Sequence, residues 1–288
     1  MQAELRRRLL IGPALALATI IALTADIAYG GHWGALLVAL VITLTASWEL
    51  PVLAASADLH ISRRSLLFGN LALLVTAVPA LGGHLGADAG SLVLGLILVL
   101  STLGQMRHHT DRFFRDLAAT LFGLLYIGWC MHLFVVLAHD GGGPPRGAQI
   151  LLMTLAICKA GDTTAFFGGR SFGRHKMAPR LSPGKTWEGA VCGILGGIGA
   201  AYLSAYLVGA PWSDTITSPF TGWWQPLVCG LVIAPVGMMG DLAESCLKRS
   251  GAVKDSSTAV PGFGGFLDIY DAILLNIPIA VLLARVLP

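Results

Sequence analysis

The stretch RRRLLIGPALALATIIALTA, residues 6–25, begins with three arginines and continues as an apolar run that carries no charge. An α-helix needs about 20 apolar residues to cross the hydrocarbon core of a bilayer. Basic residues before an apolar core are also typical of a signal peptide. Because similar runs recur along the rest of the chain, we expect a retained first transmembrane helix.

The composition of the 288-residue chain extends this pattern to the whole sequence. Hydrophobic residues make up 55% of the chain, charged residues make up 12%, and the mean hydropathy is +0.73. A soluble domain has about 25% charged residues, so a soluble fold of this length would lack charges to cover its surface. We therefore predict an all-α, polytopic transmembrane helical bundle, whose surface is mostly covered by lipid.

Nine apolar runs are long enough to span a bilayer, and no strand-like alternation separates them. The predicted spans are 9–27, 33–54, 65–82, 90–105, 116–139, 149–167, 188–209, 225–243 and 268–287. We expect a single integral membrane domain over 1–288, with N-terminal spans in 1–148 and a half that carries the polar motifs in 149–288.

The basic residues predict how this bundle is oriented. Sixteen of the 19 Lys and Arg residues fall on the side of the N-terminus, and only Arg146 and Arg285 fall on the other side. Cytoplasmic loops carry the excess of Lys and Arg, so we expect the N-terminus in the cytoplasm and the C-terminus outside. The two longest cytoplasmic loops are then 168–187 and 244–267, and chemistry on a soluble substrate is expected there.

Two ionisable residues within a predicted span are the first candidates for a site. In LLMTLAICKAGDTTAFFGGR, residues 151–170, Lys159 and Asp162 are three apart and share a helix face. Inserting such a group into a membrane costs about 2.5–3.5 kcal/mol, so it usually has a function or a partner. The two residues form either a self-neutralising packing pair or part of a functional site.

The segment SPGKTWEG, residues 182–189, opens into the next predicted span. Ser182 and Thr186 can cap a helix, and Lys185 can meet a phosphate close to the helix N-terminus. Glu188 begins the span itself. The cations of the preceding loop can face either a substrate or anionic lipid headgroups.

The segment GDLAESCLKRSGAVKDSSTAVPGFGGFLDIYD, residues 240–271, has acids at its ends and bases between them. A continued helix would place four of its polar residues on one face: Asp241, Glu244, Ser245 and Lys248. Asp268 and Asp271 begin the last span at the same depth, so antiparallel helices would bring the carboxylates together. A divalent metal with oxygen ligands would relieve their repulsion. The alternative is a solvated loop with charges at the helix ends.

These three motifs resemble, in the same order, those of the phosphatidate cytidylyltransferase (CDP-diacylglycerol synthase) family. The resemblance covers residues 159–271, and the earlier spans match in hydropathy. It implies a metal-dependent nucleotidyltransferase that moves CMP from CTP to phosphatidate, giving CDP-diacylglycerol and pyrophosphate in phospholipid biosynthesis. The implied cofactors are Mg²⁺ or Mn²⁺, with potassium as a monovalent ion. The chain departs from the family pattern at Gly184, Phe263 and Ile269.

The resemblance also implies roles for residues of this chain. The implied metal ligands are Asp241 and Asp268. The implied catalytic residues are Lys185, Lys248, Arg249, Lys254, Asp255, Asp162, Glu188 and Glu244. The implied substrate-binding residues are Ser182, Thr186, Ser245 and Asp271, to which we add Lys159.

The expected partners are CTP, phosphatidate and the lipid bilayer, with a homodimer left open and no nucleic acid. The expected location is a bacterial inner membrane, with the active site on the cytoplasmic face. One alternative is a CTP-dependent kinase of a lipid alcohol such as phytol or polyprenol, which would leave CDP. Another is a transporter that couples transport to Lys159 and Asp162, although the sequence lacks the inverted repeats and midplane charges of that class.

Overall fold

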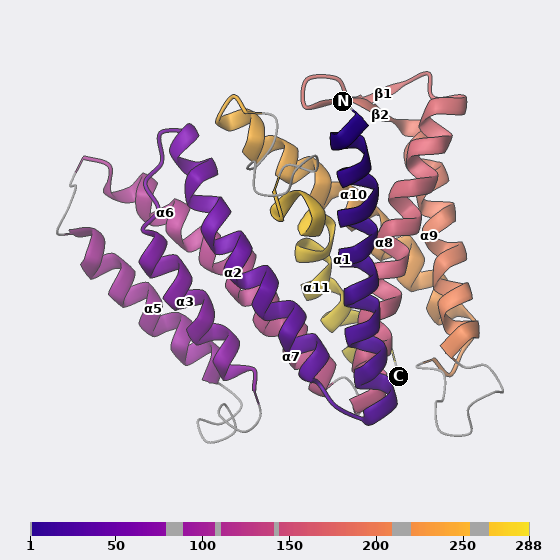
Figure 1. Ribbon diagram of the computed structural model, residues 1–288, viewed down its shortest axis with the longest axis horizontal. Coiled ribbons are helices and arrows are strands. Elements are labelled where there is room, and N and C mark those ends of the chain that lie inside the picture. Colours follow the sequence, from indigo (N-terminus) through magenta and orange to yellow (C-terminus); the bar gives the residue numbers. More distant parts are fainter. Residues whose placement is uncertain are drawn as a thin grey trace. The chain divides into compact units, whose positions relative to one another are not determined.

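The computed structural model describes residues 2–78, 89–106, 111–140, 144–208, 220–253 and 265–287, which are almost entirely helical (Figure 1). The helices are α1 (Gln2–Tyr29), α2 (Trp33–Ser56), α3 (Arg63–Thr76), α5 (Ala89–Met106), α6 (Phe113–Gly123), α7 (Cys130–Asp140), α8 (Pro144–Phe172), α9 (Trp187–Val208), α10 (Trp224–Ser250) and α11 (Leu267–Val286). A π-helical segment, η2 (Leu124–Trp129), joins α6 to α7.

Each of the nine predicted spans falls on a helix, with α6, η2 and α7 together forming one of them. Within the described ranges, seven helices are long and apolar enough to cross a membrane. The apolar part of α1, Ala14–Tyr29, is shorter than these seven helices, and α3 has 14 residues. The prediction of an all-α transmembrane bundle is therefore confirmed, while its orientation stays a prediction.

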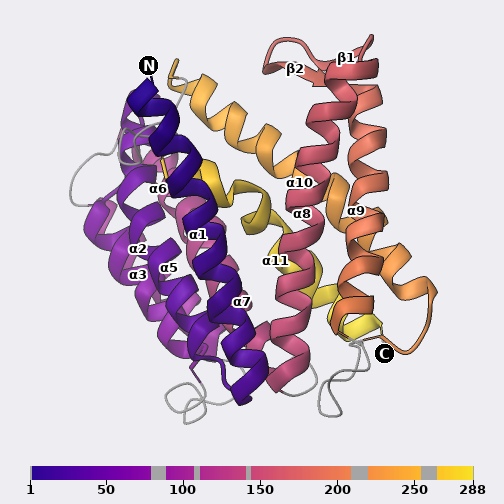
Figure 2. The same cartoon turned by 45° about the vertical axis from the view of Figure 1, so that its right-hand side comes forward.

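A short antiparallel hairpin is the element that the sequence analysis missed. Strand β1 (Lys176–Ala178) pairs with β2 (Ser182–Thr186), with Lys176 opposite Thr186. Figure 2 shows the hairpin at the end of α8 and the beginning of α9. Strand β1 has three residues, too few for alternation to be recognised, and β2 reads SPGKT, which has no alternating apolar residues.

The chain divides into two compact units, which we describe separately. The first unit comprises Met1–Thr19, Leu36–Val136 and Leu247–Tyr270. The second unit comprises Ile20–Ala35, Leu137–Cys246 and Asp271–Pro288. Helices α10 and α11 contribute to both units, since one boundary lies near the end of α10 and another within the first turns of α11.

In the first unit, α2, α3, α5 and α6 lie side by side (Figure 1). Leu66 and Leu73 of α3 and Leu124 of η2 are fully buried in this unit. The buried amide of Asn70 donates to Ser47 Oγ at 2.8 Å, so one polar contact ties α3 to α2. This hydrogen bond gives the buried amide nitrogen of Asn70 a partner.

An ion pair links the loop that follows α2 to the residue that precedes α6. Arg112 Nη1 lies 2.8 Å from Asp58 Oδ1, and this hydrogen bond lowers the pKa of the Asp58 carboxyl. His60 N donates to Asp116 Oδ1 at 3.0 Å. These contacts hold the loop between α2 and α3 against the start of α6.

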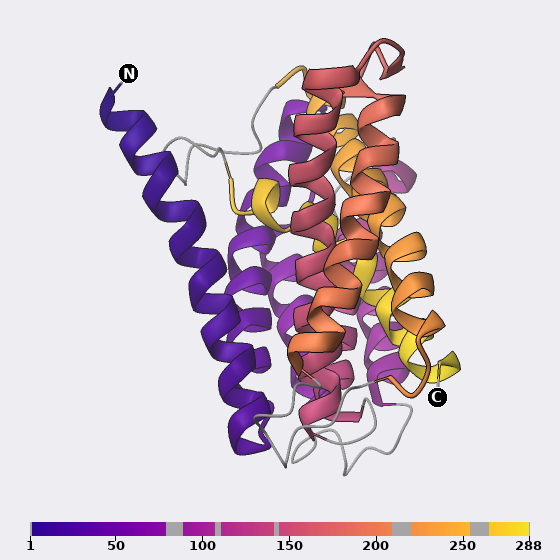
Figure 3. The ribbon, with the colours of Figure 1, turned by 90° about the vertical axis from the view of Figure 1, so that its right-hand side faces the viewer.

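In the second unit, α8 and α9 run antiparallel along each other (Figure 3), and glycines allow the close approach. A Cβ atom added at Gly161 would lie 3.4 Å from the carbonyl oxygen of Gly193. One added at Gly197 would lie 2.6 Å from Ala234 Cβ of α10, a distance that real Cβ atoms do not reach. Gly193 and Gly197 are therefore positions where the absence of a side chain allows helices to pack closely.

This packing predicts different effects for one substitution at two glycines of α9. Gly197→Val should destabilise the protein by about 1–3 kcal/mol, because the side chain overpacks the contact with α10. Gly199→Val is the matched control, since a Cβ there meets nothing within 4 Å. Thermal unfolding in detergent should show a lower Tm for Gly197→Val alone. Equal Tm values for the two variants would contradict the packing.

Candidate active site

Three carboxylates of the second unit converge between α10 and α11. Asp241 and Glu244 are three residues apart on α10, and Asp271 faces them from α11. One oxygen from each residue lies within 4.8 Å of the others. Glu244 and Asp271 are 1% and 6% exposed, so their charges have little access to water. Ionised carboxylates this close repel each other, and nearby positive charge relieves that repulsion.

A glycine allows the two helices to bring these carboxylates together. A Cβ added at Gly240 would lie 2.9 Å from the carbonyl oxygen of Asp271 and 3.0 Å from Ala272 Cα. Only a residue without a side chain therefore fits at this crossing. The glycine that precedes Asp241 in the sequence thus sets the distance between α10 and α11.

The donor set of the three residues, hereafter the carboxylate cluster, fits a hard divalent cation. All its potential ligands are carboxylate oxygens, which Mg²⁺ and Mn²⁺ prefer over nitrogen or sulfur donors. No histidine or cysteine accompanies them in the group of potential ligands found in the described part of the chain. Mg²⁺ usually keeps several waters, so a few carboxylates are enough.

The β-hairpin supplies a cation to this cluster. Lys185 of β2 places its Nζ 2.5 Å from Asp241 Oδ2 and also donates to the carbonyl oxygen of Met238 at 3.2 Å. The Lys185 side chain is 21% exposed, so the ion pair is partly shielded from water. The hairpin thus positions the lysine of the SPGKTWEG motif at the exposed edge of the carboxylate cluster.

The two ionisable residues of α8 belong to the same charged group. Asp162 lies close enough to interact electrostatically with Lys159, Asp241 and Lys185. Asp271 also interacts with Lys159 and Asp162. The structure therefore brings six of the predicted site residues together in the second unit: Lys159, Asp162, Lys185, Asp241, Glu244 and Asp271.

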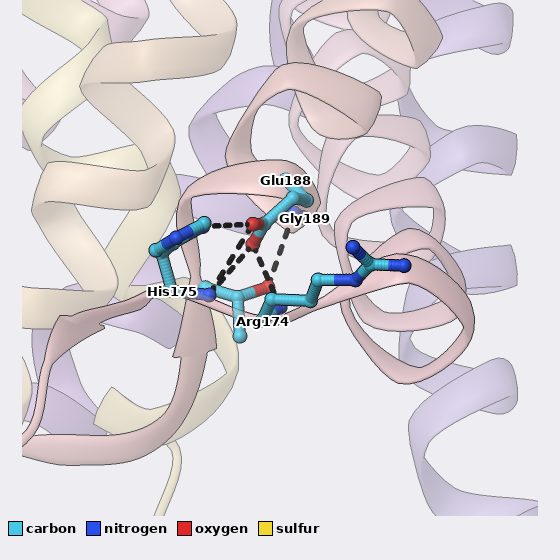
Figure 4. Close-up of polar contacts among 5 residues, drawn as sticks. Arg174, His175, Glu188 and Gly189 are labelled. Atoms are coloured by element: carbon cyan, nitrogen blue, oxygen red, sulfur yellow. Dashed lines mark hydrogen bonds and ion pairs between the residues drawn. The ribbon is translucent and has the colours of Figure 1, made fainter.

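Glu188 fixes the start of α9 to the chain before the hairpin (Figure 4). Its carboxylate accepts hydrogen bonds from the backbone N–H groups of Arg174 and His175 at 3.1 and 3.2 Å. The His175 ring nitrogen Nδ1 lies 2.6 Å from Glu188 Oε1. Glu188 thus anchors the segment that leads into the hairpin, and its predicted catalytic role stays a prediction.

Thr186 has the helix-capping role that the sequence indicates. Its Oγ1 accepts a hydrogen bond from the backbone N–H of Gly189 at 3.1 Å, and the residue is 4% exposed. Ser182 begins β2 and is half-buried. The substrate-binding roles of both residues stay predictions.

A second ion pair lies in the first unit, where α10 ends and α11 begins. Lys248 Nζ lies 2.6 Å from Asp268 Oδ1, and the two side chains are 16% and 10% exposed. Asp268 Oδ2 also accepts from the backbone N–H of Gly265 at 2.7 Å. Asp268 belongs to a different unit from Asp241, so a metal shared by these two residues stays a prediction.

For Ser245 and Arg249, the described part of the structure shows no contact that assigns a role. Ser245 is half-buried and Arg249 is exposed on the last turns of α10. Lys254 and Asp255, together with the departure at Phe263, lie outside the described residues.

Glu49 is a residue that the sequence analysis missed. It is 1% exposed within α2, and its two oxygens accept from the backbone N–H groups of Phe266 and Leu267, each at 2.9 Å. It therefore binds the N-terminus of α11 through the two residues that directly precede Asp268. A single carboxylate inside an apolar run was the available signal, because such residues usually have a function or a partner.

Comparison with known proteins identifies the relatives of this chain. Residues 13–287 match the model of the cytidylyltransferase family. A phosphatidate cytidylyltransferase of Brucella abortus biovar 1 (strain 9-941) is 34% identical over 263 residues, which cover 91% of this chain and 87% of that protein. The proteins of the same name from Bacillus subtilis (strain 168) and Thermotoga maritima are 30% and 31% identical. Their matches cover 74% and 60% of this chain and 75% and 61% of those proteins.

The carboxylate cluster predicts that a divalent cation stabilises the folded protein. Mg²⁺ should raise the Tm of the protein in detergent, since a ligand present at 100 times its Kd adds about 2.7 kcal/mol of stability. Asp271→Asn should lose at least half of this shift. Asp58→Asn, which changes an exposed carboxylate outside the cluster, should keep all of it. An unchanged Mg²⁺ response in Asp271→Asn would exclude the cluster as the cation site.

Proposed function

The chain belongs to the cytidylyltransferase family, and we propose that it transfers CMP from CTP to phosphatidate, giving CDP-diacylglycerol and pyrophosphate. The substrates are those that the name of its relatives gives: phosphatidate cytidylyltransferase. The observation that carries the proposal is the carboxylate cluster with Lys185 at its edge. Opposite charges therefore lie together within an otherwise apolar bundle, which suits a reaction between two substrates that carry phosphate groups.

The proposed reaction needs no general base from the protein. A phosphomonoester has a second pKa of about 6, so the phosphate of phosphatidate is mostly dianionic at neutral pH. One of its oxygens would attack the α-phosphorus of CTP and form the new P–O bond. The bond from the α-phosphorus to the bridging oxygen of the β-phosphate would break, and pyrophosphate would leave with that electron pair.

The main task of the protein is then to bring two anions together. Positioning the reacting groups and neutralising their charge are the main contributions to catalysis in phosphoryl transfer. We assign Lys185 and Lys248 to phosphate groups from their positions in the family motifs. Each of them also lies against a carboxylate of the proposed site. Arg249 and Lys254 follow in the same motif and are proposed to add positive charge.

Asp241, Glu244 and Asp271 would hold the divalent cation, with Asp268 as the family-implied ligand of α11. When bound, Mg²⁺ or Mn²⁺ would neutralise negative charge on the triphosphate and on the leaving pyrophosphate. Asp162 and Lys159 would adjust the charge around the cluster, because they interact with its members. Glu188 would keep the hairpin, and with it Lys185, in position. The potassium ion that the family implies is proposed without an assigned residue.

We place the active site on the cytoplasmic side of a bacterial inner membrane. The excess of Lys and Arg in alternate loops supports this orientation. Seven apolar helices of membrane length support an integral membrane protein, and bacterial relatives support the inner membrane. CTP would reach the site from the cytosol, and phosphatidate would reach it from the adjacent leaflet.

The proposal predicts the activity of four matched Asp and Glu variants. The purified protein, given Mg²⁺, CTP and phosphatidate in detergent, should form CDP-diacylglycerol detectable by mass spectrometry. Asp241→Asn, Glu244→Gln and Asp268→Asn should each lower kcat by about 100-fold or more, a loss typical for electrostatic groups of an active site. Asp58→Asn should retain the activity, because this exposed side chain pairs with Arg112 and Arg115 away from the carboxylate cluster.

Each variant should elute as a folded protein in size-exclusion chromatography, which separates lost chemistry from lost structure. If a folded Asp241→Asn variant keeps near-full activity, the cation assignment is wrong. The alternative of a CTP-dependent lipid-alcohol kinase is not favoured, because the relatives described above carry the name of the cytidylyltransferase.

A further inference from the structure

The first unit contains a large apolar pocket between α2 and α3. Its volume is about 650 Å³, and its apolar lining includes Leu44 and Trp48 of α2 and Phe68 of α3. These three side chains are 41%, 62% and 66% exposed, so the pocket opens on the outer surface of the helices. In a membrane-spanning bundle, an outer surface of this kind faces lipid acyl chains.

Two adjacent arginines give this pocket a cationic edge. Arg63 and Arg64 are the first two residues of α3, and both line the pocket. The Arg63 guanidinium carbon lies 4.9 Å from the centre of the Trp48 ring, which holds that side chain over the apolar wall. The N-terminus of α3, with Ser62 as its cap, adds the partial positive charge of the helix dipole.

We propose that this pocket binds the phosphatidate substrate, with an acyl chain against Trp48 and Phe68 and the phosphate on Arg63 and Arg64. This inference rests on the proposed function, for which it supplies the lipid site. The charge of the ligand selects phosphatidate among membrane lipids. A phosphomonoester carries a charge of about −1.5 to −2 at pH 7, which two guanidinium groups balance. A phosphodiester lipid offers one negative charge, and a zwitterionic lipid offers no net charge.

Two residues that line the pocket are also close in the structure to residues of the proposed active site. Phe266 lines the pocket and belongs to the turn at the start of α11. Glu49, the acidic residue among the described lining, directs both oxygens to the N–H groups of Phe266 and Leu267. The same turn ends in Asp268, which pairs with Lys248. A lipid in the pocket would therefore contact the segment that positions this ion pair.

The experiment uses the tryptophan that lines the pocket as its probe. The full-length protein in detergent is titrated with phosphatidate, phosphatidylglycerol or phosphatidylcholine that carry bromine on an acyl chain, which quenches nearby tryptophans. Subtracting the titration of Trp48→Phe isolates the signal of Trp48 from the other tryptophans. We expect brominated phosphatidate to quench Trp48 at a concentration about tenfold lower than the other two lipids, the effect of one charge-assisted contact.

Arg64→Gln is the main variant, because Arg64, unlike Arg63, has no ring contact with Trp48 in the described structure. It should abolish the preference for phosphatidate and raise the KM for phosphatidate about tenfold, with the KM for CTP unchanged. Arg115→Gln is the matched control, since this arginine is half-exposed and contacts Asp58 away from the pocket. Arg64→Lys keeps the charge and should keep most of the preference, which excludes misfolding as the cause.

Two results would overturn the pocket as the phosphatidate site. One is equal quenching of Trp48 by all three lipids, and the other is an unchanged preference in folded Arg64→Gln. Quenching requires no turnover, so it separates this inference from the proposed function. CDP-diacylglycerol formation without selective quenching would refute the pocket alone. Selective quenching in a protein that forms no CDP-diacylglycerol would refute the proposed reaction and leave phosphatidate binding in place.

Discussion

The convergence of three carboxylates in an apolar chain is the constraint on which the second unit depends. Asp241, Glu244 and Asp271 place oxygens within 4.8 Å of one another, and two of the three are buried. When the carboxylates are ionised, compensating positive charge stabilises such an arrangement. Gly240 allows the close helix crossing that creates it, and the β-hairpin brings Lys185 to its edge. Glu188 in turn fixes the chain from which the hairpin extends.

In the first unit, the backbone N–H groups at the start of α11 also need hydrogen-bond acceptors. The first N–H groups of a helix have no partner within the helix, and burying them unpaired is costly. Glu49 and Asp268 accept three backbone N–H groups of residues 265–267, and Lys248 neutralises Asp268. This network lies beside the apolar pocket between α2 and α3. In the proposed enzyme, this hydrogen-bond network would link the lipid-binding pocket to Lys248, which we assign to a phosphate group.

Features that follow from local sequence were predictable here, and helix direction also predicted that carboxylates from the two ends of one motif would meet. Hydropathy averaged over about 20 residues locates all nine predicted spans on helices, because lipid imposes that length. Helix periodicity places Asp241 and Glu244 on one face, and the motif predicts Thr186 as a cap. The hairpin was missed because its strands are short. Glu49 was missed because its partners lie more than 200 residues further along the chain.

The account's central claim is that CMP, rather than the terminal phosphate of CTP, moves to the lipid. CTP labelled with ³²P at either the α- or the γ-phosphate tests this claim directly when each is incubated with the protein, Mg²⁺ and phosphatidate. We predict that the α-label enters the lipid fraction and that the γ-label leaves in pyrophosphate. A γ-label in the lipid, with the α-label retained in CDP, would contradict the claim.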